Sequence, residues 1–199
     1  MLVHETWLFV YILLFHSLLF GLRSYLLWKQ TGVRAITFQN RDDAHDWNGR
    51  LFTFLSLAAV AIAAVYAFSA SWYVLLVPIP YLEGPALHLV GWALLLLSLP
   101  VIFLAQMQMA GSWRVGIDEK ERTPLVTHGL FSCSRNPIFL GLLVSLLGFF
   151  FVVPNAYSLL LLGLSYASIQ IQVRLEEPFL RAQHGAAYER YCEQVRRWV

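Results

Sequence analysis

The chain has 199 residues, of which 58% are hydrophobic and 13% are charged, whereas soluble domains are about 45–50% apolar and about 25% charged. This excess of apolar residues is too large for one soluble core. The low charge excludes a disordered chain, two cysteines exclude a disulfide scaffold, and a net charge of +2 without clustered basic residues gives no signal for nucleic-acid binding. The composition therefore indicates a small protein that crosses a membrane several times.

Apolar runs of about 18 residues or more are long enough to cross a bilayer as helices. Three such runs lie near Trp7–Leu27, Leu51–Val77 and Leu87–Met109. A fourth apolar block, Ile138–Val173, has no charged residue and carries the turn signal Pro154-Asn155 near its middle, which predicts two shorter helices joined by a tight bend. The expected fold is all-α: a bundle of five transmembrane helices, followed by a short cytosolic amphipathic helix near the C-terminus.

The basic residues predict the orientation of this bundle, because Lys and Arg near the ends of spans are retained in the cytosol. All fourteen fall into three stretches: Arg23 to Arg50, Arg114 to Arg135, and Arg174 to Arg197. The loops on the opposite side contain none, so we expect the N-terminus outside and the C-terminus in the cytosol. The first span lacks the positive start and cleavage site of a signal peptide, so we expect it to be retained as a membrane helix.

Two cytosolic segments, Gly111–Pro137 and Arg174–Val199, are long and polar enough to form a site. The first ends in Asn136-Pro137, a helix-start signal in which Asn136 can cap and proline occupies the first helical position. A helix N-terminus with His128 and Arg135 nearby suits an anion. The simpler alternative is an ordinary capped helix with an arginine at the membrane interface.

The second segment begins on a helix, where Arg174, Glu177 and Arg181 share one face and Glu176 points elsewhere. Pro178 removes a backbone donor, so we expect this helix to kink or end near Glu177. The two carboxylates can bind a cation or an ammonium group, or can form an exposed network with the arginines.

A second helix is expected beyond the break at His184-Gly185. Tyr188, Tyr191, Cys192 and Val195 recur at a spacing of three to four residues, which is typical of an amphipathic helix. This helix can lie on the membrane or close over a site.

Other polar residues have two interpretations each. Glutamines near the cytosolic ends of the spans either line a polar pocket or hydrogen-bond between helices; they are Gln106, Gln108, Gln170 and Gln172. An acidic cluster before the second span resembles a metal site in composition, but such clusters more often cap a helix, so no metal is expected. This cluster consists of Asp42, Asp43, His45 and Asp46.

The two cytosolic segments together resemble the isoprenylcysteine carboxyl methyltransferase-like and phospholipid methyltransferase families. The similarity lies in Gly111-Ser112-Trp113-Arg114, in the run from Leu125 to Phe131, in Arg135-Asn136-Pro137-Ile138-Phe139-Leu140-Gly141, and in Arg174-Leu175-Glu176-Glu177-Pro178-Phe179-Leu180 with Gly185, Tyr188 and Tyr191. These families are integral membrane enzymes that use S-adenosylmethionine. The resemblance divides the chain into a three-helix part, residues 1–110, and a methyltransferase-like part, residues 111–199.

The resemblance also implies a cofactor site between the segment before the fourth span and the tail after the fifth. The residues that correspond by position are His128, Gly129, Leu130, Phe131, Arg135, Asn136, Pro137, Phe139, Gly141, Glu176, Glu177 and Tyr188. S-adenosylmethionine offers its carboxylate to His128 or Arg135, its ammonium group and ribose hydroxyls to the two glutamates, and its adenine to aromatic side chains.

The expected reaction is methyl transfer to a lipophilic acceptor at the cytosolic membrane face. A carboxylate acceptor of the isoprenylcysteine type needs no general base, and we favour it; Arg174 can then orient the anion. A phospholipid amine or a thiol would need deprotonation, for which Glu177 is the first candidate. Two other classes stay open: an NADPH-dependent membrane reductase and a non-catalytic membrane scaffold.

Overall fold

The computed structural model describes residues 2–33, 35, 42–114 and 123–199. Among these residues all the regular structure is helical, which confirms the all-α prediction. The longer helices are α1 (Leu2–His16), α2 (Arg23–Thr31), α3 (Ala44–Phe68), α5 (Pro85–Met109), α6 (Pro137–Val152), α7 (Ala156–His184) and α8 (Ala186–Gln194). The short elements are the π-helix η1 (Ser17–Leu22), the helix α4 (Ala70–Tyr73), and the 3-10 turns η2 (Val74–Leu76), η3 (Pro80–Leu82), η4 (Ala110–Ser112) and η5 (Gly129–Ser132).

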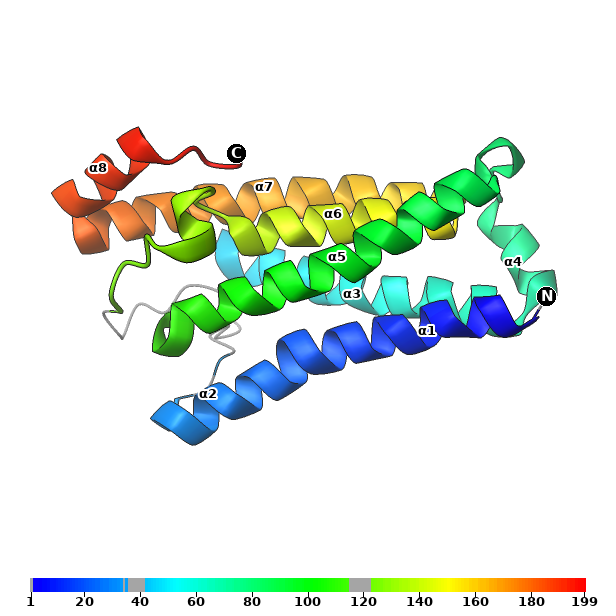
Figure 1. The fold of residues 1–199 in the computed structure, drawn as a ribbon, viewed down its shortest axis with the longest axis horizontal. Helices are drawn as coiled ribbons and strands as arrows, with labels where there is room; N and C mark the ends of the chain where they lie inside the picture. Colours follow the sequence, from blue (N-terminus) through cyan, green and yellow to red (C-terminus); the bar gives the residue numbers. More distant parts are fainter. Residues whose placement is uncertain (1, 34, 36–41, 115–122) are drawn as a thin grey trace.

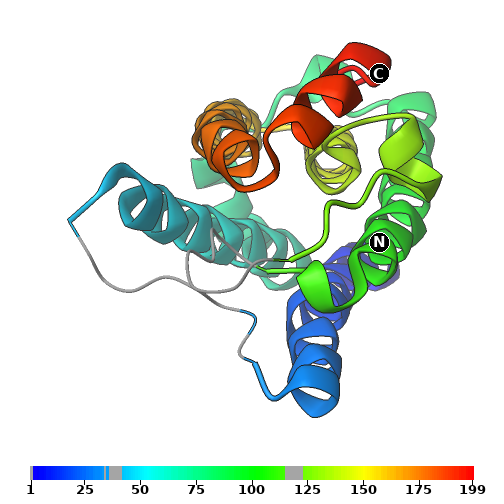
Figure 2. The same ribbon diagram turned by 90° about the vertical axis from the view of Figure 1, so that its left-hand side faces the viewer.

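The long helices lie side by side along the long axis of the molecule, with α4 at one end and α8 at the other (Figure 1). Five helical segments run along this axis: α1-η1-α2, α3, α5, α6 and α7. Figure 2 looks along them from the α8 end. Their order along the chain agrees with the predicted order of the spans.

Four of the helical segments in the described part of the chain are long and apolar enough to cross a membrane: Thr6–Thr31, Ala44–Phe68, Pro85–Ser112 and Ala156–His184. The fifth, α6, has only 16 residues, or about 24 Å of helix against about 30 Å of hydrocarbon. The predicted count of five spans therefore becomes four candidate spans and one shorter apolar helix. The orientation stays a prediction, and four of its basic residues, Arg34, Arg41, Lys120 and Arg122, lie outside the described residues.

Local signals explain where several helices begin. Asp43 caps α3 by accepting a hydrogen bond from the backbone N–H of Asp46 at 2.8 Å, and Pro85 and Pro137 occupy the first turns of α5 and α6. Asn155 begins α7 with a reciprocal capping box to Ser158. The predicted tight bend at Pro154-Asn155 is therefore confirmed.

The helix α7 does not end at Glu177, so of the two outcomes expected from Pro178, a kink or an end, the end is wrong. It continues to His184 and stops only at Gly185, whose positive φ of 52° suits a glycine. The prediction of a helix break at His184-Gly185 is confirmed. Pro178 removes one backbone bond, but the turns on either side hold the helix together, so both glutamates project from one continuous element.

The core is formed by apolar side chains of α1, α3, α5, α6 and α7, among them Leu8, Ile62, Leu95 and Phe149. Large apolar side chains also cover the outside of the bundle; Leu57 and Leu97, for example, are 64% and 65% exposed. An apolar exterior around a packed core is what a bilayer requires.

Candidate functional site

A cavity of about 450 Å³ lies at the α8 end of the bundle. Its walls come from α1, η1, α2, α3, α5, the segment before α6, the first turns of α6, the C-terminal part of α7, and α8. Most of its lining is apolar, and the charged groups gather where α7, α8 and the segment before α6 meet. A cavity with one charged end suits a ligand that combines ionic groups with apolar surface.

Eight of the predicted cofactor residues line this cavity. They are Phe131, Arg135, Asn136, Pro137, Phe139, Glu176, Glu177 and Tyr188. The first five come from the segment before α6 and its first turn, and the others come from α7 and α8. The structure therefore brings together two parts of the chain that are about 40 residues apart in sequence, as the resemblance implied.

Four other predicted cofactor residues do not line the cavity. His128 is exposed, and Gly129 adopts a positive φ of 62°. The backbone N–H of Leu130 donates to Oε1 of Gln108 at 2.8 Å, so this stretch is tied to α5. Gly141 packs against α5, where a Cβ would lie 2.5 Å from Cγ1 of Ile102. The positions of Gly129, Leu130 and Gly141 fit a role in shaping the wall.

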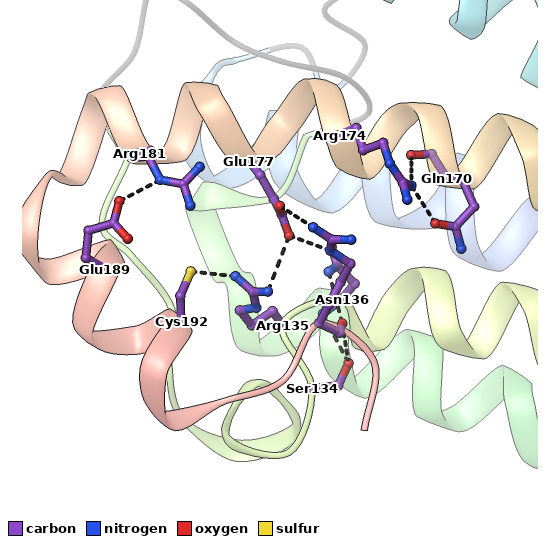
Figure 3. A network of polar contacts seen from close by, with 10 residues as sticks. Ser134, Arg135, Asn136, Gln170, Arg174, Glu177, Arg181, Glu189 and Cys192 are labelled. Carbon is purple, nitrogen blue, oxygen red and sulfur yellow. Dashed lines mark hydrogen bonds and ion pairs between the residues drawn. The ribbon is translucent and has the colours of Figure 1, made fainter.

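Arg174, predicted to orient the acceptor, is exposed and lies outside the cavity lining. Its Nη1 donates to the backbone oxygen and to Oε1 of Gln170, at 2.9 and 2.6 Å. Figure 3 shows this pair beside Glu177 but separate from its network. The structure therefore does not bring Arg174 to the site.

Glu177 is the centre of a charged network (Figure 3). Arg197 donates to its two carboxylate oxygens from Nε and Nη2, each at 2.8 Å. Nη2 of Arg135 lies 3.5 Å from Oε1, and Nη1 of Arg135 donates to the Cys192 sulfur. Because two guanidinium groups already hold this carboxylate, Glu177 ties the end of the chain to the site.

The segment after α8 folds back along the start of α6. The backbone N–H of Arg135 donates to the carbonyl of Arg196 at 3.0 Å. The side chains of Ser134 and Asn136 donate to the carbonyl of Arg197 at 3.3 and 3.1 Å. The Asn136 side chain therefore does not cap α6, contrary to the prediction, because it binds this terminal segment instead.

Sequence reasoning missed Arg197 as a site residue. It was visible only as one of several arginines in a basic tail, and its pairing with Glu177 depends on the return of the chain after α8. The return itself follows from the end of α8 at Gln194 and the extended backbone of Val195.

Tyr188 and Tyr191 hold α8 against the wall of the cavity. Tyr188 is 2% exposed, and the Tyr191 hydroxyl donates to the Phe131 carbonyl at 2.6 Å. Burial raises the pKa of Tyr191 to about 12 and raises the pKa of Tyr188 as well. Both phenols are therefore neutral at physiological pH, and Tyr191 is a dependable donor. The amphipathic helix is confirmed, and one face of it closes this end of the cavity.

Glu176 differs from its neighbour. Its Oε1 accepts a hydrogen bond from Nε2 of Gln172 at 2.8 Å. No arginine or lysine pairs with it among the described residues. Glu176 is therefore the carboxylate that faces the cavity without a cationic partner.

A buried arginine supports the opposite wall. Arg23 is 1% exposed, donates from Nη2 to the carbonyls of Gln106 and Ala110, and lies 5.1 Å from the centre of the Trp113 ring. A cation at this point satisfies the final carbonyls of α5 and complements its helix dipole. Gln106 lines the cavity and also donates to the Leu19 carbonyl at 3.1 Å, so both interpretations of this glutamine hold.

The acidic cluster before α3 is compact: one ligand atom from each of Asp43, His45 and Asp46 lies within 4.8 Å of the others. Asp43 nevertheless acts as the N-cap of α3, as expected for acids in this position. The cluster is outside the cavity lining.

The fold and the cavity define a helical membrane protein with a polar site at one end of its bundle. The model of the family described as phospholipid methyltransferase matches residues 86–187, which is just over half of the chain. The chain therefore belongs to this family, as the resemblance indicated, and it is a membrane methyltransferase by family. No curated protein and no solved structure matches the chain significantly.

Proposed function

We propose that this protein transfers a methyl group from S-adenosylmethionine to a lipophilic acceptor at the cytosolic face of the membrane. The observation that carries the proposal is the cavity of about 450 Å³, because it joins eight predicted cofactor residues in one space. The family match, residues 86–187, contains seven of these eight residues and ends just before the eighth, Tyr188.

The groups that face the cavity fit this cofactor. Arg135 lines the cavity, and its guanidinium group suits the cofactor carboxylate. Glu176 offers carboxylate oxygen to an ammonium group or to ribose hydroxyls. Phe131, Phe139 and Tyr188 provide aromatic surface for an adenine ring.

The bound cofactor would supply an electrophilic methyl group on a sulfonium centre; the carbon-sulfur bond breaks as the bond to the acceptor forms. The task of the chain is then to position both partners and exclude water. The charged network of Glu177, Arg135 and Arg197 holds the terminal segment and α8 in place. The apolar walls from α1 and α3 accommodate the hydrocarbon part of the acceptor.

The acceptor head group decides whether a base is needed. A carboxylate reacts without losing a proton, whereas an ammonium group or a thiol must first be deprotonated. Two guanidinium groups occupy the Glu177 carboxylate, so Glu177 is unsuited to be this base. The family description favours a phospholipid amine, and the isoprenylcysteine-type carboxylate is the acceptor to compare with it.

Calorimetric titration of the detergent-purified protein tests the cofactor. We expect S-adenosylmethionine and its demethylated product to bind, Glu176→Gln to weaken this binding about tenfold, and Arg174→Ala to leave it unchanged. Arg174 is a matched control because it lies on the same helix, two residues away, outside the cavity. A folded wild-type protein that binds NADPH and no adenosyl ligand would contradict the proposal and favour a reductase.

A transfer assay with a radiolabelled methyl donor distinguishes the acceptors. Vesicles containing phosphatidylethanolamine would yield a base-stable N-methyl product, whereas an isoprenylcysteine acid would yield a methyl ester that base hydrolyses to methanol. Cofactor binding without methyl transfer to any lipophilic acceptor would favour the alternative that the protein is a non-catalytic membrane scaffold.

A further inference from the structure

Asn48 is a buried polar residue on α3, far in sequence from the region that matches the family. Its side chain is 1% exposed although it lies near the polar end of the bundle. Its Nδ2 donates to the Ser168 carbonyl at 3.1 Å and to Oε1 of Gln172 at 3.0 Å, and its Oδ1 accepts from the Ser168 hydroxyl at 2.8 Å. Asn48 therefore binds α7 at three points.

The direction of these hydrogen bonds follows from the backbone. A carbonyl can only accept, so the amide nitrogen of Asn48 must face Ser168. The same nitrogen then requires an acceptor on Gln172, which turns Oε1 of Gln172 toward α3. The Gln172 nitrogen is left to donate to Oε1 of Glu176, at 2.8 Å. Both amide orientations are fixed in this way, and the chain of bonds ends in a donor aimed at the carboxylate.

This chain leaves one Glu176 oxygen available. Oε1 is occupied by Gln172, while Oε2 has no hydrogen bond among the described residues, and both Glu176 and Gln172 line the cavity. Glu177, by contrast, is held by Arg197 and Arg135. The rotamer of Glu176, and hence the position of its free oxygen, depends on a bond that Asn48 orients.

We propose that Asn48 is a positioning residue that acts through Gln172 to hold the Glu176 carboxylate toward the bound S-adenosylmethionine. The inference rests on the proposed function, and it gives the N-terminal three-helix part a role in the site in addition to membrane anchoring. The alternative is that Asn48 only joins α3 to α7, as buried amides in helical bundles often do.

Asn48→Asp separates the two roles. The carboxylate that this substitution introduces cannot donate, so Gln172 must turn its nitrogen toward α3 and present its oxygen to Glu176, where two acceptors then face each other. We expect affinity for S-adenosylhomocysteine to fall about tenfold. In a Glu176→Gln background the introduced amide can donate to the turned Gln172, so the added effect of Asn48→Asp should be less than about twofold.

Calorimetric titration with S-adenosylhomocysteine on wild type, Asn48→Asp, Glu176→Gln and the double variant forms a double-mutant cycle. Arg174→Ala, on the outer face of α7, is the control. Thermal unfolding in detergent verifies that each protein is folded, and Asn48→Ala replaces the aspartate variant if that one does not fold. Asn48→Ala leaves Gln172 without its donor. We therefore expect a smaller fall in S-adenosylhomocysteine affinity, which should again disappear in the Glu176→Gln background.

Each outcome decides one question. A loss that disappears in the Glu176→Gln background supports the positioning role. An equal loss in both backgrounds, or no loss at all, overturns it while leaving the methyltransferase proposal intact. A folded wild-type protein that binds no adenosyl ligand overturns the proposed function, and this inference with it.

Discussion

At the scale of single residues, the difference between Glu176 and Glu177 is central to the site. Sequence analysis placed both glutamates near the end of the last long helix and named Glu177 as the first candidate for a base. The structure shows that their partners differ: Arg197, twenty residues later, pairs with Glu177, while Gln172 donates to Glu176. Helical periodicity gives the direction of a side chain but not the groups that meet it.

Replacing Arg197 tests the role of the terminal segment. Arg197→Ala removes the two-pronged contact with Glu177, so the segment after α8 should loosen and adenosyl affinity should fall about threefold to tenfold. Arg196→Ala is the matched control, because Arg196 is exposed and contributes its backbone carbonyl to Arg135. Calorimetry measures the affinity, and limited proteolysis reports cleavage near residue 195. Equal behaviour of the two variants would show that the ion pair does not hold the segment.

The Tyr191 hydroxyl gives a prediction about alkaline stability. Its folded pKa of about 12 exceeds the unfolded value of about 10, so the unfolded state loses the proton first. The stability that this phenol contributes is complete below pH of about 10 and is lost as the pH rises through about 12. Tyr191→Phe should cost about 1 kcal/mol at neutral pH through the lost bond to Phe131, and its stability should decline less across this alkaline range.

Thermal unfolding of the wild-type protein and of Tyr191→Phe in detergent, from neutral to alkaline pH, measures how much stability each loses. Tyr188 remains in both and contributes equally to each curve. Parallel curves would contradict the assignment of the Tyr191 hydroxyl as a buried donor.

At the scale of elements, hydropathy located every long helix because a lipid-facing helix must be apolar along most of its length. The boundaries were less predictable. The second helix begins at Ala44, seven residues before the expected Leu51, and α7 ends at His184, well beyond Val173, where the expected apolar block ends. These polar turns are stabilised by caps and by contacts with other helices, which an apolar window does not detect. The candidate site lies on these polar extensions.

The crossing of α5 and α6 depends on two glycines. A Cβ at Gly148 would lie 2.8 Å from the backbone oxygen of Gly91 and 3.0 Å from the backbone nitrogen of Leu95. Backbone atoms cannot move aside as a flexible side chain can, so Gly148→Ala should destabilise the protein by about 1–3 kcal/mol.

Gly163→Ala on α7 is the control for this substitution, because a Cβ at Gly163 meets nothing within 4 Å. Alanine favours a helix more than glycine does, so this variant should be neutral or slightly stabilised. Thermal unfolding of both variants in detergent tests the contrast. A Gly148→Ala protein as stable as wild type would mean that the helices cross at a greater distance.

At the scale of the whole molecule, the family-matched region and the N-terminal helices form one site together. The cavity takes His16 from α1 and Phe52 from α3 as well as the residues that the resemblance implied. The resemblance covered the cytosolic segments, so it could not reveal walls contributed by spans that look like generic membrane helices. Tertiary packing, which brings α3 against α7, supplies what the local pattern lacks.

The orientation of the bundle is the prediction with the widest consequence, because it places the cavity on the cytosolic side. Cys133 is exposed and lies at the α8 end, so a membrane-impermeant maleimide should label it in inverted vesicles and not in intact cells. Labelling of a Cys133→Ser variant measures how much of the maleimide signal comes from Cys192, the other free cysteine. Labelling from outside the cell would mean that the bundle has the opposite orientation and that the cavity faces away from the cytosol. The positive-inside distribution predicts the cytosolic result because translocating the arginines around Cys133 is unfavourable.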